Sequence, residues 1–92
     1  MARDRENVKI PPKTWIEVTD GATTGPFTWV VRAGEMTSFQ GTASAVAPTD
    51  PEAGIPYERG EGESVPLSMF WGSSAQHLYA YSELGAVIYT NG

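Results

Sequence analysis

The sequence predicts a small all-β domain, either a β-sandwich or a β-barrel of about seven short strands, with an extended N-terminal arm. Short runs of β-branched and aromatic residues alternate with polar ones, and this period of two is typical of half-buried strands. The runs recur about every eight to twelve residues, as in sandwiches and barrels. Turn-forming residues separate them, since the 92 residues include 10 Gly and 7 Pro.

The N-terminal segment differs from the rest of the chain in its charge. Residues 1–7 are charged and almost without apolar side chains, so we expect a flexible arm there and a single β domain over residues 8–92. The whole chain has a net charge of −5, and most of its six basic residues lie near the N-terminus, so the rest of the chain, the body, is strongly acidic. Four of those six lie in the first thirteen positions, namely Arg3, Arg5, Lys9 and Lys13.

The first half of the domain contains the clearest strand patterns. Residues 8–10 alternate before two prolines, and residues 14–19 form a β-branched and aromatic run. The strongest pattern covers residues 27–33. Its alternation predicts one face with Phe27, Trp29, Val31 and Ala33, and an opposite face with Thr28, Val30 and Arg32.

The middle of the chain gives weaker patterns. We expect a strand over residues 36–40, a short extended piece over 43–46 and one helical turn over 48–54, where Pro, Asp and Gly stand at capping positions. Residues 59–64 predict a polar loop, and residues 65–71 return to apolar character. The helical turn is too short to alter the all-β class.

The C-terminal residues predict a β-hairpin. Its strands would cover residues 77–82 and 85–90, with Glu83 and Leu84 in the turn. On the first strand, alternation places Tyr79 and Tyr81 on one face together with His77. We expect one of the two faces to be exposed or covered by another subunit.

Composition excludes several classes of function. Without Cys, the chain has no disulfides or thiolate metal ligands, so its stability must come from apolar burial or from partner subunits. A pI near 4.6 argues against binding nucleic acid, which requires clustered basic residues. The sequence contains neither a stretch of about 20 apolar residues nor a secretory signal. We therefore expect that the protein does not associate with membranes and that it is made in a cytosol-like compartment.

No residue pattern indicates catalysis, a cofactor or a metal site. His77 is the only histidine, so a second imidazole is missing for metal binding. Gly60 and Gly62 lie among glutamates that would repel a phosphate group. The same acidic residues lack the spacing of a calcium loop, although the sequence leaves open whether any carboxylates meet in space. We therefore predict that the protein is not an enzyme.

Aromatic residues leave two interpretations open. The three Trp and four Tyr residues would suit a stacking platform for sugars, as in carbohydrate-binding modules. Aromatic side chains also dominate small cores and protein interfaces. We favour the second interpretation, with a sugar-binding module as the alternative.

The order of these motifs resembles a group of small phage and prophage virion proteins that run from an early Trp strand to a C-terminal hairpin. The resemblance covers most of the chain after Val8. It rests on residues 14–19, 25–31, 47–49, 60–62, 78–82 and 85–87. It implies a structural role, as a capsid decoration (cement) protein or as an accessory of the tail or fibre, in a protein made in the bacterial cytoplasm and kept in the virion.

The resemblance also implies partners. Proteins of this kind cluster as trimers, so we expect a homotrimer that binds the major capsid protein or another virion protein, whereas a tail location would favour contact with host glycans. The basic arm suits contact with an acidic capsid surface or the addition of a strand to a sheet edge. The candidate partner-binding residues are Arg3, Arg5, Lys9, Lys13, Trp29, Arg32, Tyr79 and Tyr81.

Overall fold

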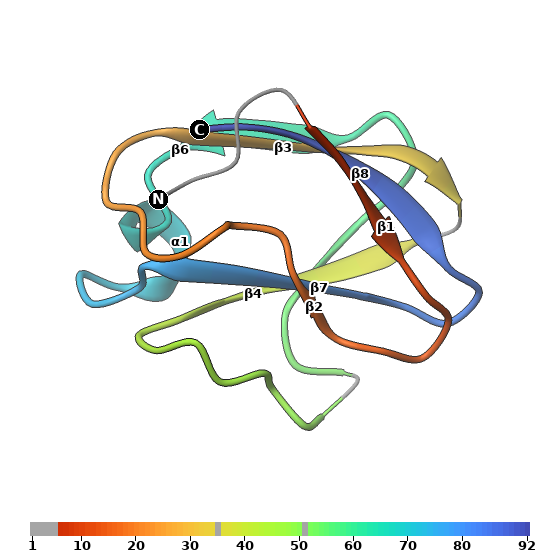
Figure 1. The fold of residues 1–92 in the computed structure, drawn as a ribbon, viewed down its shortest axis with the longest axis horizontal. Helices are drawn as coiled ribbons and strands as arrows, with labels where there is room; N and C mark the ends of the chain where they lie inside the picture. The colour runs from red at the N-terminus through yellow and green to blue at the C-terminus, as the bar shows by residue number, and fades with distance from the viewer. Residues whose placement is uncertain (1–5, 35, 51) are drawn as a thin grey trace.

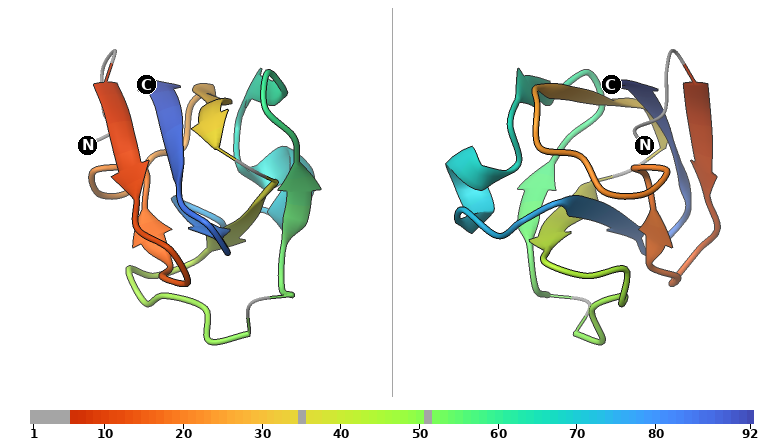
Figure 2. Two further views of the ribbon diagram at one scale, coloured as in Figure 1. Left: turned by 90° about the vertical axis from the view of Figure 1, so that its right-hand side faces the viewer. Right: turned by 60° about the vertical axis from the view of Figure 1, so that its left-hand side comes forward.

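Two antiparallel sheets pack face to face in the computed structural model, which describes residues 6–34, 36–50 and 52–92 (Figures 1 and 2). Within these residues each sheet has four strands, in the orders β1-β8-β3-β6 and β2-β7-β4-β5. The predicted all-β class is confirmed, and of the two architectures expected the fold is the sandwich. The strands are β1 (Glu6–Ile10), β2 (Ile16–Glu17), β3 (Phe27–Gly34), β4 (Thr37–Thr42), β5 (Ile55–Tyr57), β6 (Gly62–Val65), β7 (His77–Ser82) and β8 (Ala86–Asn91).

The core lies between the sheets and is centred on Trp29. Phe27, Trp29 and Val31 share one face of β3, as predicted, and all three are completely buried. A bulge then shifts the register between Val31 and Ala33, and Ala33 pairs with Val87 on the outer face. The prediction that Ala33 shares a face with Val31 is therefore wrong, because an extra residue in a strand reverses the alternation beyond it.

The predicted C-terminal hairpin is wrong in its pairing, although both strands exist. β7 pairs with β2 and β4, whereas β8 pairs with β1 and β3 in the other sheet. The chain therefore crosses between sheets at residues 83–85, and Gly85 supports this turn with a φ of 93°. Both strands have one apolar face, and each covers the same core from its own side.

The remaining differences occur where pairing overrides local sequence. β1 begins at Glu6, inside the segment expected to be an arm, while residues 1–5 lie outside the described part. β5 contains a proline and β6 contains a glycine, and both strands lie at sheet edges, where such residues are tolerated.

Two predicted elements of the middle segment are absent from the described residues. No strand covers 43–46, and the described residues of 48–54 form turns and bends without a helix. The short helix is instead α1 (Ser68–Trp71), which follows Pro66 and lies within the apolar run 65–71.

Candidate interaction surfaces

A groove of ≈ 620 Å³ lies at the end of the sandwich where the β3–β4 and β7–β8 connections meet the loop between β4 and β5. We call it the acidic groove. Its floor includes Tyr81, whose ring packs against Trp15 with a centroid distance of 5.3 Å. The described residues that line it are Met36, Ser38, Asp50, Glu52, Tyr81, Glu83 and Leu84.

Three carboxylates give this groove its charge. Asp50 Oδ1 accepts a hydrogen bond of 2.9 Å from the backbone N–H of Glu52, and Glu83 Oε2 accepts one of 2.8 Å from the Tyr81 hydroxyl. The bond to Glu83 raises the pKa of Tyr81, because it stabilises the neutral phenol. None of the three acids forms an ion pair with a basic residue of the described chain, so their negative potential is not neutralised locally.

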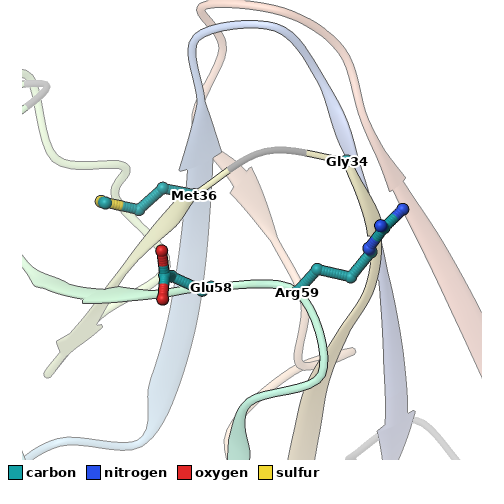
Figure 3. Close-up of a pocket in the computed structure, with 4 residues that line it drawn as sticks. All are labelled: Gly34, Met36, Glu58 and Arg59. Carbon is teal, nitrogen blue, oxygen red and sulfur yellow. The ribbon is translucent and has the colours of Figure 1, made fainter.

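Two exposed apolar side chains flank the acidic groove. Met36 is 54% exposed and Leu84 is 69% exposed, and both belong to connections that are anchored by the adjoining strands. Figure 3 shows Met36 beside the carboxylate of Glu58 in an adjoining depression, while the Arg59 side chain extends the other way. Carboxylates with apolar neighbours suit a ligand that carries a cation on an aliphatic stem.

The outer face of the sheet β1-β8-β3-β6 has the opposite charge, and we call it the basic face. Lys9 is exposed on β1 opposite Val87, and Arg32 is exposed on β3 with its guanidinium carbon 6.0 Å from the centre of the Tyr89 ring. Between them, Val87 and Tyr89 are only half-buried. The face therefore combines two cations with a small apolar centre.

A third cluster surrounds the carboxylate of Glu17. Its Oε2 accepts hydrogen bonds from Thr19 Oγ1 at 2.9 Å and Gly21 N at 3.3 Å, and it lies 2.9 Å from His77 Nδ1. Thr19 Oγ1 in turn accepts the backbone N–H of Leu78 at 3.1 Å. These bonds fasten β2 and the loop after it to β7, so we interpret the cluster as structural.

Sequence reasoning could not find the Glu17 cluster, because 60 residues separate Glu17 from His77. The acidic groove was also missed, since its lining comes from separate parts of the chain. The only signal in the sequence was the excess of acids over bases in the body.

The structure separates the predicted partner-binding residues into three groups. Lys9, Lys13 and Arg32 are exposed, whereas Arg3 and Arg5 lie outside the described residues. Trp29 has 0% exposure, and the prediction that it contacts a partner is wrong for this fold, because its ring lies in the core. Tyr79 and Tyr81 are only 6% and 8% exposed, so neither presents an open ring face to a partner.

The aromatic side chains gather mainly in the core. The Trp29 ring lies 5.9–6.4 Å from the rings of its aromatic neighbours. These neighbours are Phe27, Phe39, Tyr57, Phe70 and Trp71. No group of three or more His, Asp or Glu residues in the described ranges has an arrangement that would hold a metal ion.

Comparison with known proteins gave no relative. Neither a protein-family model nor a curated protein nor a solved structure matched the chain. Within the described part of the chain, no helix has the length and apolar character needed to cross a membrane.

Proposed function

We propose that the protein is a structural, non-enzymatic component of a phage-type virion, and that it decorates the capsid as an oligomer, most simply a homotrimer. The observation that supports this proposal best is the position of β1. This strand lies at the edge of its sheet, contains Lys9 and follows the segment that carries Arg3 and Arg5. An exposed edge strand with adjoining cations can pair with a strand of a particle subunit and steer it by charge.

The edges of the two sheets differ in their capacity for pairing. β2 has only two residues, and β5 has three with a proline in the middle. β6 has four residues and starts at a glycine. β1 has five residues without Gly or Pro, and within the described chain it has a strand neighbour on one side only. It is therefore the edge best suited to strand addition.

The basic face lies beside this edge and would provide the rest of the particle contact. Lys9 belongs to β1 itself, and Arg32 lies two strands away in the same sheet. Because the remainder of the chain is acidic, this face is the part that would be attracted to an acidic capsid surface. The assignment to a phage particle is supported by the order of sequence motifs, which resembles that of small phage virion proteins.

Co-sedimentation with phage heads tests the proposal. The heads come from the phage or prophage that encodes this chain and are prepared without it. The wild-type protein is expected to sediment with them and to raise the temperature at which they release DNA. Replacing Lys9→Gln and Arg32→Gln should weaken binding about tenfold, equivalent to about 1.4 kcal/mol.

The matched control carries the same change in net charge at the opposite sheet. Ala43→Glu and Ala45→Glu lie at exposed positions in the loop after β4, so this variant should bind like the wild type. The proposal is wrong if the wild-type protein fails to bind heads. It is equally wrong if the basic-face variant and the control bind with the same affinity as the wild type.

A further inference from the structure

A hollow of ≈ 280 Å³ lies in the basic face, over the start of β8. We call it the β8 hollow, and Val87 lines it from this strand. Lys9 of β1 pairs with Val87 from one side, and Ala33 of β3 pairs with it from the other. The three outward side chains therefore form a row across three neighbouring strands, and the turn that crosses between the sheets adds Leu84 as a wall.

The bulge in β3 leaves the space for this hollow. In regular pairing Arg32 would stand opposite Val87, but the register shift puts the small Ala33 there instead. The guanidinium carbon of Arg32 lies 6.0 Å from the centre of the Tyr89 ring, farther along the basic face. A methyl group therefore occupies the position beside Val87 where a long side chain would otherwise fill the hollow.

The β8 hollow is apolar apart from one cation, Lys9. The described residues that line it include no acid, and Glu83 accepts a hydrogen bond of 2.8 Å from Tyr81 of the other sheet. Leu84 is 69% exposed beside it. Pockets for drug-sized ligands measure about 300–1,000 Å³, so the volume of this one suits a single side chain. An aliphatic side chain could cover Leu84 and Val87 while a neighbouring carboxylate meets Lys9.

The charges of the basic face indicate which chain provides this side chain. The protein's own N-terminal segment contains Arg3 and Arg5, which Lys9 and Arg32 would repel. Two copies that met through this face would likewise bring their cations together. An acidic segment of a different protein satisfies both the cation and the apolar lining.

We propose that the β8 hollow binds an aliphatic side chain flanked by carboxylates, and that this segment belongs to the particle protein on which the chain assembles. The inference rests on the proposed function and names the anchor of that contact. In protein interfaces a few side chains seated in pockets supply most of the affinity, whereas charges at the rim steer the encounter. Lys9 and Arg32 would attract the partner, and the β8 hollow would hold it.

Amide chemical shifts in NMR test the chemistry of the hollow without phage heads. The probe is the peptide acetyl-Gly-Glu-Leu-Glu-Gly-amide, and two control peptides replace its Leu by Ser or both Glu by Lys. The probe should shift the amides of Lys9 and Val87 in a saturable manner, and each control should bind about tenfold more weakly. Equal binding of the three peptides overturns the proposal. Shifts confined to Ser38 and Tyr81 also overturn it, because they place the peptide in the acidic groove.

Two equally exposed residues test the anchor on the particle. Leu84→Ser removes the wall, and Val46→Ser removes a side chain that is 68% exposed and does not line the hollow. Leu84→Ser should bind heads about tenfold more weakly than the wild type, whereas Val46→Ser should bind like it. Ala33→Val, which fills the β8 hollow and leaves the acidic groove unchanged, should also weaken binding. Thermal unfolding checks that each variant is folded.

The outcomes distinguish this inference from the proposed function. Wild-type binding to heads that neither Leu84→Ser nor Ala33→Val weakens overturns the anchor and leaves the capsid assignment in place. A protein that binds the probe at the hollow but ignores heads supports the specificity of the hollow and overturns the capsid assignment. An oligomer that Leu84→Ser dissociates, as measured by light scattering, identifies the occupant as a second copy and overturns the particle protein as partner.

Discussion

Individual side chains in this protein have roles that depend on how deeply they are buried. Trp29 looked in the sequence like a candidate for partner contact, yet it is the largest completely buried side chain. Its Nε1 has no hydrogen-bond partner within the described residues, so the indole contributes through its ring surface alone. Lys9, Lys13 and Arg32 are exposed instead, so their charges are available for contact with a partner.

Replacing Trp29 with alanine should destabilise the fold strongly. Loss of a large buried aromatic ring costs about 3–5 kcal/mol, because apolar burial is lost and a cavity remains. Urea denaturation measures this cost. Met69→Ala is a suitable control, since Met69 is 65% exposed and its loss should change the free energy of unfolding by less than about 0.5 kcal/mol. Similar stabilities for the two variants would contradict the position of Trp29 in the core.

At the scale of elements, α1 depends on a contact with the strand beneath it. Trp71 in α1 lies over Gly41 of β4, and a Cβ added at Gly41 would be 2.7 Å from the indole ring. The missing side chain at this position therefore allows a four-residue helix with no buried residues to stay against the sheet. The indole also extends the aromatic packing around Trp29, with a centroid distance of 5.9 Å.

Gly41→Ala should displace Trp71 and destabilise the protein by about 1–3 kcal/mol, since the ring must move to avoid the new methyl group. The shift would appear as a change in tryptophan fluorescence together with a lower urea midpoint. Gly25→Ala provides a matched control, because a Cβ there meets nothing within 4 Å and its φ is not in the left-handed region. If both variants match the wild type, Trp71 does not pack on Gly41.

At the scale of the whole molecule, charge is distributed unevenly between the surfaces of the sandwich. Glutamates of the acidic body lie near three of the four tyrosines and affect their pKa values. Burial and then Glu63 raise the pKa of Tyr57, burial and then Glu17 raise that of Tyr79, and the hydrogen bond to Glu83 raises that of Tyr81. All three shifts favour the neutral phenol in the folded state.

Stability should consequently decrease at alkaline pH. Below the unfolded-state pKa of about 10, tyrosines are neutral in both states and the folded protein keeps its full stability. Above it, the unfolded chain loses phenol protons first, so unfolding is favoured as the pH rises. Urea midpoints at about pH 9 and about pH 11 would show the decrease, and Tyr57→Phe should make it smaller. A urea midpoint that is constant or rises over this pH range would contradict the raised tyrosine pKa values.

The sequence determined the all-β class, most strand positions, the residues that share a face of β3 up to Val31, and the concentration of basic residues near the N-terminus ahead of an acidic body. Those features follow from local alternation and composition, which each residue carries with it. The pairing of strands, the bulge before Ala33, the crossing between sheets at residues 83–85 and the acidic groove were decided by tertiary structure. They depend on contacts between residues far apart in the chain, where burial of a shared core outweighs local preference.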